Sequence, residues 1–411
     1  MDLERTLKSL RKIKLADKEE EVPFITDEPK IPSFICFPNT RTQSVFSTEK
    51  TYGQGFDREV LLARIKSRGE FFERLCLYNP NPQDFKASKF YEDGTFIDPR
   101  IFYCYSEEQT PNKVEKLERR KEGIYRWFEA QDIIGNKRVY IPSQLIFLSP
   151  IFQDEFALRK EQISTGAAFG PADSEMAFKS GLLEVIERDA CISSYLKKVR
   201  MKRVANLPDH IESLKKYIER YNLQAHIFDV TTDLAVPSIM AITIDSTGVG
   251  NAVNVGSKSA LSYSEAIIGA LMESVQCRRS SRIFGRIMFN QKPISEDEII
   301  SLEDRFVYWS PKQKIADLSY LLDSAEEVVY ADIPKKKISL DDVVNSMTSR
   351  GYNLFVADIT LPEIRNAGFQ TLKVVIPELH PLYLDERAKS LYSVHHGEIK
   401  DDKTLKPHPI T

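Results

Sequence analysis

The sequence is short of the residues that would build a disulfide framework, a zinc finger or a membrane span. Its 411 residues include five cysteines without a CxxC pair, which is typical of reduced thiols in a cytoplasmic protein. The six histidines form no HxxxH or HExxH pair, and the adjacent His395 and His396 indicate no metal site. No apolar run approaches the ~20 residues of a membrane helix. The N-terminus has no apolar signal region. We therefore expect a cytoplasmic protein with no membrane partner.

Neither sign of charge is in large excess, because the chain has 57 lysines and arginines and 60 aspartates and glutamates, a net charge of −3. This balance argues against a general nucleic-acid-binding protein. Hydrophobic residues make up 42% of the chain, enough for a sizeable core. Helices are predicted over residues 58–78, 173–199, 210–221 and 262–279, and strands over 226–231, 238–244, 353–359 and 371–376. We expect an α+β fold that mixes the two.

Three segments of the chain repeat one pattern. In each, a glycine-containing loop precedes an alanine. An acid follows seven residues after the alanine, a second acid or amide three residues later, and then an arginine. The anchors are Ala63, Glu70, Glu73 and Arg74; then Ala177, Glu184, Glu187 and Arg188; then Ala266, Glu273, Gln276 and Arg278. Because seven residues are close to two helical turns, each copy presents these side chains on one stripe of a helix.

Two interpretations of the repeated acids are open. Acids three residues apart on a helix usually mark a solvated face. Here the flanking positions are apolar, as with Phe71 and Phe72 in the first copy and Val185 and Ile186 in the second. Carboxylates in such surroundings lose hydration, which is costly unless a cation compensates. An arginine or Mg²⁺ could supply that charge, and Mg²⁺ prefers carboxylate oxygens together with substrate phosphates. We favour this second interpretation.

Longer motifs resemble those of the YcaO family. TYGQGFDREVLLARIKSRGEFFERL resembles the GKG…SAxGExxER opening of the family, and STGAAFGPADSEMAFKSGLLEVIERDA resembles its GLAAGNTxxEAxxxGLxExxERDA segment. EAIIGALMESVQCRR resembles a third block, and FVADITLPEIRNAGFQTLKVVIPELHPL resembles the C-terminal VDxT…VVRVIVPGLxPL. The likeness runs from Phe34 to Leu382. It implies a YcaO-like α+β domain over 34–385, with three repeated acidic helices around a nucleotide site. Residues 1–33 would be an extension and 386–411 a tail.

The resemblance implies an ATP-dependent enzyme that activates peptide backbone amides with the help of Mg²⁺. Family members add a nucleophile to an amide carbonyl and transfer the γ-phosphate of ATP to the resulting oxygen. The implied metal ligands are Glu70, Glu73, Glu184 and Glu187. The implied nucleotide-binding residues are these four acids with Arg74, Arg188, Glu273, Gln276, Arg278 and Arg282. The implied catalytic residues are Glu187, Arg188, Pro409 and Thr411.

Three positions depart from the family pattern. The lysine of GKG is Gln54, the serine four residues before the first motif acid is Lys66, and the asparagine of AAGNT is replaced by Pro171 or Ala172. These departures put the affinity for nucleotide in question, while the acids and arginines are retained. The alternative is a non-catalytic relative that serves as a scaffold in a complex.

The C-terminus indicates which reaction to expect. The chain ends in LKPHPIT, which partly matches the proline-rich tail of azoline-forming members, whose terminus reaches the active site. A disordered, proline-stiffened end is the alternative. We expect cyclodehydration of Cys, Ser or Thr in a ribosomally made precursor peptide to thiazoline or oxazoline. Thioamide or amidine formation is the alternative reaction.

The implied partners are the precursor peptide and a separate peptide-binding protein of the ubiquitin-activating-enzyme-like type. The second is expected because about fifty residues before the first motif are too few for a fused recognition domain. A flavin-dependent dehydrogenase could complete an azole, in a homodimeric or heteromeric complex. The mixed-charge segment 3–21 is a candidate partner contact or a solvated helix. Residues 106–123 are expected to be a flexible insertion. Arg279, Arg282 and Arg286 form a basic edge that could meet phosphate or a leader peptide, and a solvated surface is the favoured interpretation.

Overall fold

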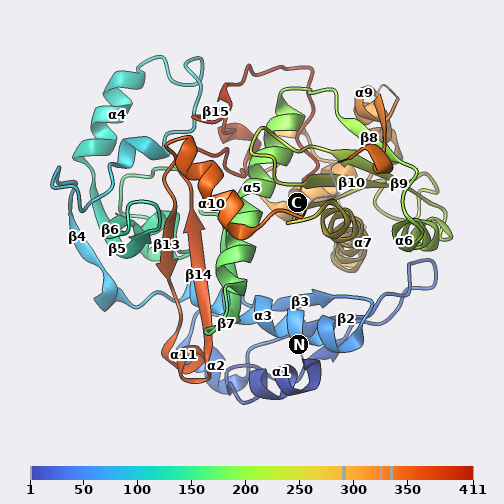
Figure 1. The fold of residues 1–411 in the computed structure, drawn as a ribbon, viewed down its shortest axis with the longest axis horizontal. Coiled ribbons are helices and arrows are strands. Elements are labelled where there is room, and N and C mark those ends of the chain that lie inside the picture. The colour runs from blue at the N-terminus through green and yellow to red at the C-terminus, as the bar shows by residue number, and fades with distance from the viewer. Residues whose placement is uncertain (1, 289–292, 324–325, 334–336, 411) are drawn as a thin grey trace.

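The computed structural model describes residues 2–288, 293–323, 326–333 and 337–410, with side chains 283–288 left undescribed (Figure 1). The helices are α1 (Leu3–Leu10), α2 (Thr40–Val45), α3 (Val60–Tyr78), α4 (Lys113–Glu122), α5 (Met176–Leu196), α6 (Asp209–Glu219), α7 (Tyr263–Met288), α8 (Leu302–Trp309), α9 (Ser319–Leu322), α10 (Leu340–Ser349) and α11 (Pro362–Asn366). The strands are β1 (Glu20–Glu21), β2 (Ser33–Cys36), β3 (Gly53–Phe56), β4 (Lys86–Lys89), β5 (Ile124–Asp132), β6 (Lys137–Pro142), β7 (Ala167–Pro171), β8 (Lys202–Ala205), β9 (Leu223–Asp229), β10 (Ser238–Asp245), β11 (Val253–Ser259), β12 (Glu326–Val329), β13 (Phe355–Asp358), β14 (Phe369–Val375), β15 (Tyr392–Ser393) and β16 (Gly397–Glu398).

The mixed α and β architecture confirms the predicted fold class. The four predicted helices correspond to α3, α5, α6 and α7, and the four predicted strands to β9, β10, β13 and β14. The helix α7 continues nine residues beyond the predicted end at 279. No glycine or proline interrupts residues 280–284, so the local sequence contains no stop signal there.

Three sheets carry the three repeated helices. The order of the first is β1-β2-β3, that of the second is β11-β10-β9-β8-β12, and that of the third is β4-β5-β13-β14-β7 with β6 beside β5. Every residue of β10 is buried, as expected for a central strand covered on both faces. Figure 1 shows α5 upright in the middle of the molecule, α3 below it beside β3, and α7 on the far side of α5 from β14.

The first 33 residues pack on the rest of the chain. Helix α1 buries Leu7 and Leu10, which are 4% and 1% exposed, and β1 pairs antiparallel with β2. The solvated-helix alternative is therefore wrong for the apolar face of α1, which is covered by this chain itself. Helix α1 remains polar on its outer face, where Glu4, Arg5 and Lys8 are exposed.

The charged segment 106–123 was predicted to be a flexible insertion, but it contains helix α4. Its Arg120 is 3% exposed and donates to the backbone carbonyl of Leu158. The helix also has three basic residues in its last turn, where cations interact favourably with the helix dipole. The buried side chain of Arg120 thus anchors α4 to the rest of the fold, although the composition of this segment indicated a loop.

The last described residues of the tail are buried within the fold. Pro407, His408, Pro409 and Ile410 are all buried. The hydroxyl of Tyr195 on α5 donates to the carbonyl of Lys406 at 3.1 Å, and the guanidinium of Arg305 donates to the carbonyl of His408 at 2.6 Å. The interpretation as a disordered end is therefore wrong for residues up to 410, while Thr411 lies outside the described residues.

Candidate active site

The three repeated segments fold into three equivalent strand–helix units. In each unit a backbone N–H at or just before a strand donates to the first acid of the following helix. The N–H of Gln54 donates to Glu70 Oε2 at 2.7 Å, and the N–H of Gly166 donates to Glu184 Oε2 at 2.9 Å. The N–H of Ser257 donates to Glu273 Oε2 in the same way. The sequence repeat therefore corresponds to a repeated hydrogen bond that fixes one carboxylate per helix.

Small residues allow each strand to lie directly against its helix. A Cβ atom on Gly55 would come within 1.7 Å of the carbonyl oxygen of Ala63 on α3. A Cβ atom on Gly256 would come within 2.3 Å of the carbonyl oxygen of Ala270 on α7. Neither strand could approach its helix so closely with any other residue. The glycines of the repeat are thus packing residues that bring the backbone donors to the acids.

An acid of α5 influences the pKa of an acid of α3. Burial raises the pKa of the Glu73 carboxyl well above its ordinary value, and the nearby charges of Glu184 and Glu70 raise it further. Burial likewise raises the pKa of Glu184, with Arg188 opposing that shift. The charge of Glu184 thus disfavours ionisation of the partly buried Glu73, and a bound cation would relieve this repulsion.

Lys373 on β14 is a candidate site residue that the sequence analysis missed. Its side chain is 1% exposed, and its ammonium donates to the carbonyls of Ile163, Ser164 and Thr165 at 2.9, 3.0 and 2.7 Å. Burial lowers the pKa of Lys373 to about 7, although the nearby charges of Glu184 and Glu73 act to raise it. The three carbonyls also favour the charged form. In the sequence, this residue could be recognised only as a lysine at an inward-facing position of the alternating strand pattern TLKVV.

Glu187 and Arg188 of α5 meet Ser257 of β11. Ser257 Oγ donates to Glu187 Oε1 at 2.8 Å, and the Arg188 guanidinium donates to Ser257 Oγ at 3.2 Å. The ammonium of Lys258 lies 3.6 Å from Glu187 Oε2. Burial and the charge of Glu187 raise the pKa of Glu273 to about 7. This second cluster joins the acids of α5 and α7, and Ser257 and Lys258 were not among the predicted site residues.

Two further predicted residues, Arg74 and Gln276, lie on α3 and α7. Arg74 forms an ion pair of 2.5 Å with Glu70. Gln276 lies one turn after Glu273 on α7 and is partly buried. Of the substituted positions, Gln54 accepts a hydrogen bond from Ser280 on α7 at 2.9 Å, while Lys66 points to Asp57 at 2.6 Å.

Arginines at the end of α7 are engaged by the N-terminal segment. Arg278 forms ion pairs with Asp245 at 2.7 Å and with Glu28 at 3.1 Å. Arg282 forms ion pairs with Asp27 and Glu28. The expectation of a solvated basic edge was wrong, because Arg279 is 1% exposed and donates to the carbonyls of Ile31, Val22 and Pro23. The side chain of Arg286 lies outside the described residues.

The donor set fits magnesium together with a triphosphate. Among the described residues, no three of the repeated acids bring carboxylate oxygens within 4.8 Å of one another. Mg²⁺ commonly uses one or two protein carboxylates and completes its octahedron with water and phosphate oxygens. Carboxyl groups with raised pKa values, next to the partly exposed Lys258 and the guanidinium of Arg188, provide charges of both signs for such a complex.

A family model described as "YcaO cyclodehydratase, ATP-ad Mg2+-binding" matches residues 52–380. The chain belongs to the YcaO family. This membership confirms the resemblance seen in the motifs, and it confirms ATP and Mg²⁺ as the cofactors expected from them.

Relatives with solved structures share the fold. A heterocyclase in complex with substrate and cofactor is 18% identical, with a TM-score of 0.74 over 100% of this chain and 57% of its own. YcaO from Methanopyrus kandleri, bound with AMPPCP and Mg²⁺, is 16% identical with a TM-score of 0.66 over 92% of this chain and 91% of its own. The E. coli microcin synthetase McbBCD complex with pro-MccB17 bound contains a chain 14% identical, with a TM-score of 0.67 and 96% coverage of both chains.

One curated relative aligns with part of the chain. A protein of Rhizobium leguminosarum bv. trifolii, named for its place in the tfuA 3′ region, is 31% identical over 222 residues. The alignment covers 51% of this chain and 47% of the relative. This chain thus matches about half the length of that relative, and about three fifths of the heterocyclase. Among the described residues, no helix is both long and apolar enough to cross a membrane.

Proposed function

We propose that this chain is an ATP-dependent cyclodehydratase of a ribosomally made precursor peptide. A Cys, Ser or Thr side chain of the peptide adds to the preceding backbone amide carbonyl. The oxygen that becomes negative in this step takes the γ-phosphoryl group of ATP, and ADP is released. Departure of phosphate then leaves a thiazoline or oxazoline ring. Each ring formed removes one water from the peptide.

The observation that carries this proposal is the repeated hydrogen bond that fixes one carboxylate per unit, together with the electrostatic influence of Glu184 of α5 on Glu73 of α3. Glu70 and Glu73 of α3 and Glu184 and Glu187 of α5 are the proposed Mg²⁺ ligands. Bound Mg²⁺ would neutralise charge on the transferred phosphoryl group, which is the main task in this chemistry. Glu273 and Gln276 are proposed to complete the nucleotide site from α7.

Cations of the chain are proposed to bind the phosphates. Arg188 and Lys258 lie at Glu187 between α5 and β11, and Arg74 lies at Glu70. Arg278 and Arg282 remain proposed phosphate contacts, with the condition that Glu28 and Asp27 would have to release them. Positively charged groups at fixed positions stabilise developing phosphate charge without reorganisation.

The buried tail supports azoline formation. Pro409 and Thr411 are proposed to belong to the catalytic centre, and the hydrogen bond from Tyr195 links the tail to the helix that carries Glu187. A separate peptide-binding protein is proposed to deliver the substrate, since the microcin synthetase relative is a complex with a bound peptide. A flavin-dependent dehydrogenase and a homodimeric or heteromeric assembly are proposed with it.

Mass spectrometry of a co-expressed precursor peptide tests the proposal. The peptide is produced with this protein and its peptide-binding partner, with either the native chain or Glu187→Gln. We expect the loss of one water mass per modified residue, and no loss with Glu187→Gln. Exchange of oxygen for sulfur would instead assign the chain to thioamide formation. An unmodified peptide together with no ATP turnover in the complete complex would favour the scaffold.

A further inference from the structure

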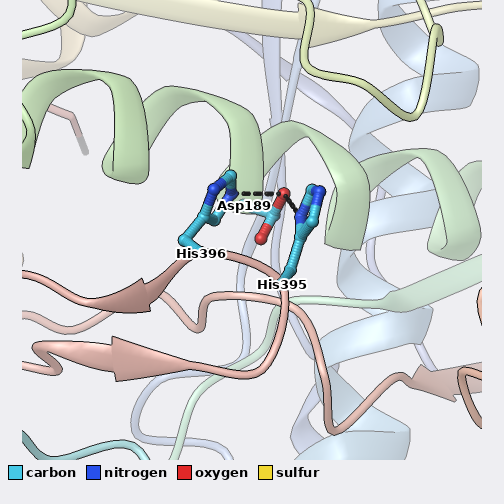
Figure 2. Close-up of side chains that lie close together, drawn as sticks. All are labelled: Asp189, His395 and His396. Atoms are coloured by element: carbon cyan, nitrogen blue, oxygen red, sulfur yellow. Dashed lines mark hydrogen bonds and ion pairs between the residues drawn. The ribbon is translucent and has the colours of Figure 1, made fainter.

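Two adjacent histidines of the C-terminal segment meet an aspartate of α5. His395 and His396 lie between β15 and β16, and Asp189 directly follows Arg188 on α5. Asp189 Oδ2 lies 2.8 Å from His395 Nδ1 and 3.1 Å from His396 Nε2. Figure 2 shows the two imidazole rings on either side of this carboxylate, reaching up from the hairpin to the helix. His395 and His396 therefore contact the same oxygen atom of Asp189, which lies 206 positions before His395 in the chain.

Asp233 forms a hydrogen bond with the second ring nitrogen of His395. Its carboxylate accepts from His395 Nε2 at 2.6 Å. Asp233 belongs to the loop between β9 and β10, and its side chain is 67% exposed, whereas those of His395 and Asp189 are 3% and 0% exposed. A carboxylate on the far nitrogen of a histidine is the usual arrangement that orients a metal-binding imidazole and makes it a better ligand.

The spacing of the three inner atoms fits a small divalent ion. Among the described residues, Asp189, His395 and His396 are the one group of His, Cys, Asp and Glu side chains with all ligand atoms within 4.8 Å of each other. Ligands ~2.0–2.1 Å from a tetrahedral Zn²⁺ lie ~3.3 Å from one another. The two separations that involve Asp189, 2.8 and 3.1 Å, are about 0.2–0.5 Å shorter than this value.

We propose that Asp189, His395 and His396 bind one divalent transition-metal ion of the Zn²⁺ class, with Asp233 as the outer partner of His395. Two imidazoles and one carboxylate suit Zn²⁺, Ni²⁺ or Cu²⁺, whereas Mg²⁺ prefers oxygen ligands alone. The site is therefore chemically distinct from the acidic site for Mg²⁺. The partly exposed His396, at 12%, leaves one side of the group near solvent for a water ligand.

Hydrogen bonding without metal is the competing account of this cluster. Burial alone would raise the pKa of Asp189, but the hydrogen bonds from His395 and His396 lower it to about 2. Burial alone would lower the pKa of His395, but Asp189 and Asp233 raise it. A metal ion would replace the protons that His395 Nδ1 and His396 Nε2 direct at Asp189, and both protons would pass to solvent. Each account needs the same residues, so metal binding itself has to be measured.

The metal would tie the end of the chain to the helix of the active site. The β15–β16 hairpin precedes the buried tail, and Asp189 is two residues from Glu187 on α5. An ion bound here would fix the hairpin against α5 and so restrict where the tail can lie. This consequence is structural and does not depend on which peptide reaction the chain performs.

Metal titration of the full chain tests the proposal. The chain is purified without a histidine tag, stripped with EDTA and titrated with Zn²⁺ by calorimetry in excess Mg²⁺. We expect one Zn²⁺ per chain. The variant His396→Gln should lose this binding, and Asp233→Asn, which changes an exposed side chain, should weaken it ~10–100-fold. The exposed His210, which contacts Ser264, supplies the matched control His210→Gln, which should bind as the native chain does.

A second measurement separates this site from the acids and the cysteines. Co²⁺ bound by nitrogen and oxygen should give weak visible absorption without the strong near-ultraviolet band of a thiolate ligand. Glu73→Gln should leave Zn²⁺ binding unchanged. The proposal is overturned if the native chain binds no stoichiometric Zn²⁺, if folded His396→Gln binds it with native affinity, or if Glu73→Gln abolishes it.

Discussion

The hydroxyl of Ser257 on β11 donates to Glu187 Oε1 on α5 at 2.8 Å, and these residues are 70 positions apart in the chain. The same hydroxyl accepts from Arg188, and the backbone N–H of Ser257 donates to Glu273. One small residue thus joins the second and third units of the repeat. It holds two of their acids and one arginine in fixed positions, as the proposed phosphoryl-transfer site requires.

Ser257→Ala should weaken both the fold and the site. Loss of the hydroxyl leaves Glu187 with one hydrogen-bond donor fewer in a buried place, which costs about 1–3 kcal/mol of unfolding free energy. Urea denaturation of the purified chain measures this change. The control is Ser349→Ala, whose hydroxyl bonds within the exposed surface of α10 and which should stay within about 0.5 kcal/mol of the native chain. Equal stability of the two variants would contradict the role of Ser257.

Gly55→Ala should be strongly destabilising, because its new Cβ would lie 1.7 Å from the carbonyl oxygen of Ala63. Strand β3 would have to move away from α3, and the N–H of Gln54 would move with it from Glu70. The matched control is Gly69→Ala within α3, where the Cβ would lie 3.6 Å from Phe169, an ordinary contact. Alanine favours a helix over glycine by ~1 kcal/mol, so we expect this control to be as stable as the native chain or more so. Thermal unfolding compares the two.

The stability of the Mg²⁺-free chain should fall as pH rises from about 5 to 7. Glu273 has its pKa raised to about 7, and those of Glu73 and Glu184 are raised as well. At these three acids the folded chain therefore holds more protons than the unfolded chain in this range, and their contribution to stability is lost as the protons leave. The buried His380 and His408, whose pKa values burial lowers, act in the opposite sense. Excess Mg²⁺ should reduce this loss by binding the ionised acids. Urea midpoints at pH 5 and pH 7, with EDTA or Mg²⁺, provide the measurement. The loss between pH 5 and pH 7 should be smaller in Glu273→Gln, and an unchanged pH dependence in that variant would contradict the assignment.

Glu28→Gln should show whether the N-terminal segment stabilises the end of α7. Glu28 is 1% exposed and pairs with Arg278 and Arg282. Removing one partner of a buried ion pair typically costs about 3–5 kcal/mol, although Asp245 remains beside Arg278. The exposed Glu21 of β1 provides the control Glu21→Gln, which should change little. A Glu28→Gln chain as stable as this control would show that the ion pairs contribute nothing measurable.

The sequence predicted the features of the site that lie within one helix. The spacing of Glu70 and Glu73, and of Glu184 and Glu187, follows from the helical period, and the resemblance supplied the cofactors. The sequence alone could not predict which strand residue contacts which acid. The contact between Ser257 and Glu187 depends on how β11 packs on α5, and Lys373 enters from a strand almost two hundred residues after Glu184.

Other features were missed because local composition does not report burial. The arginines near the end of α7 looked like a basic edge, but carboxylates and carbonyls from residues 22–31 cover Arg278 and Arg279. Likewise, His395 and His396 matched no metal-binding spacing along the chain. Their partner Asp189 is distant in sequence and reaches them only because the C-terminal hairpin lies on α5.

Calorimetric titration with AMPPCP in the presence and absence of Mg²⁺ tests the central claim most directly, since it asks whether the repeated acids bind Mg²⁺ and nucleotide. The native chain is compared with Glu187→Gln and with Glu115→Gln, whose side chain is 55% exposed on α4. The account predicts one nucleotide per chain, bound only with Mg²⁺, retained by Glu115→Gln and weakened at least tenfold in Glu187→Gln. Native affinity in a folded Glu187→Gln chain would contradict the account.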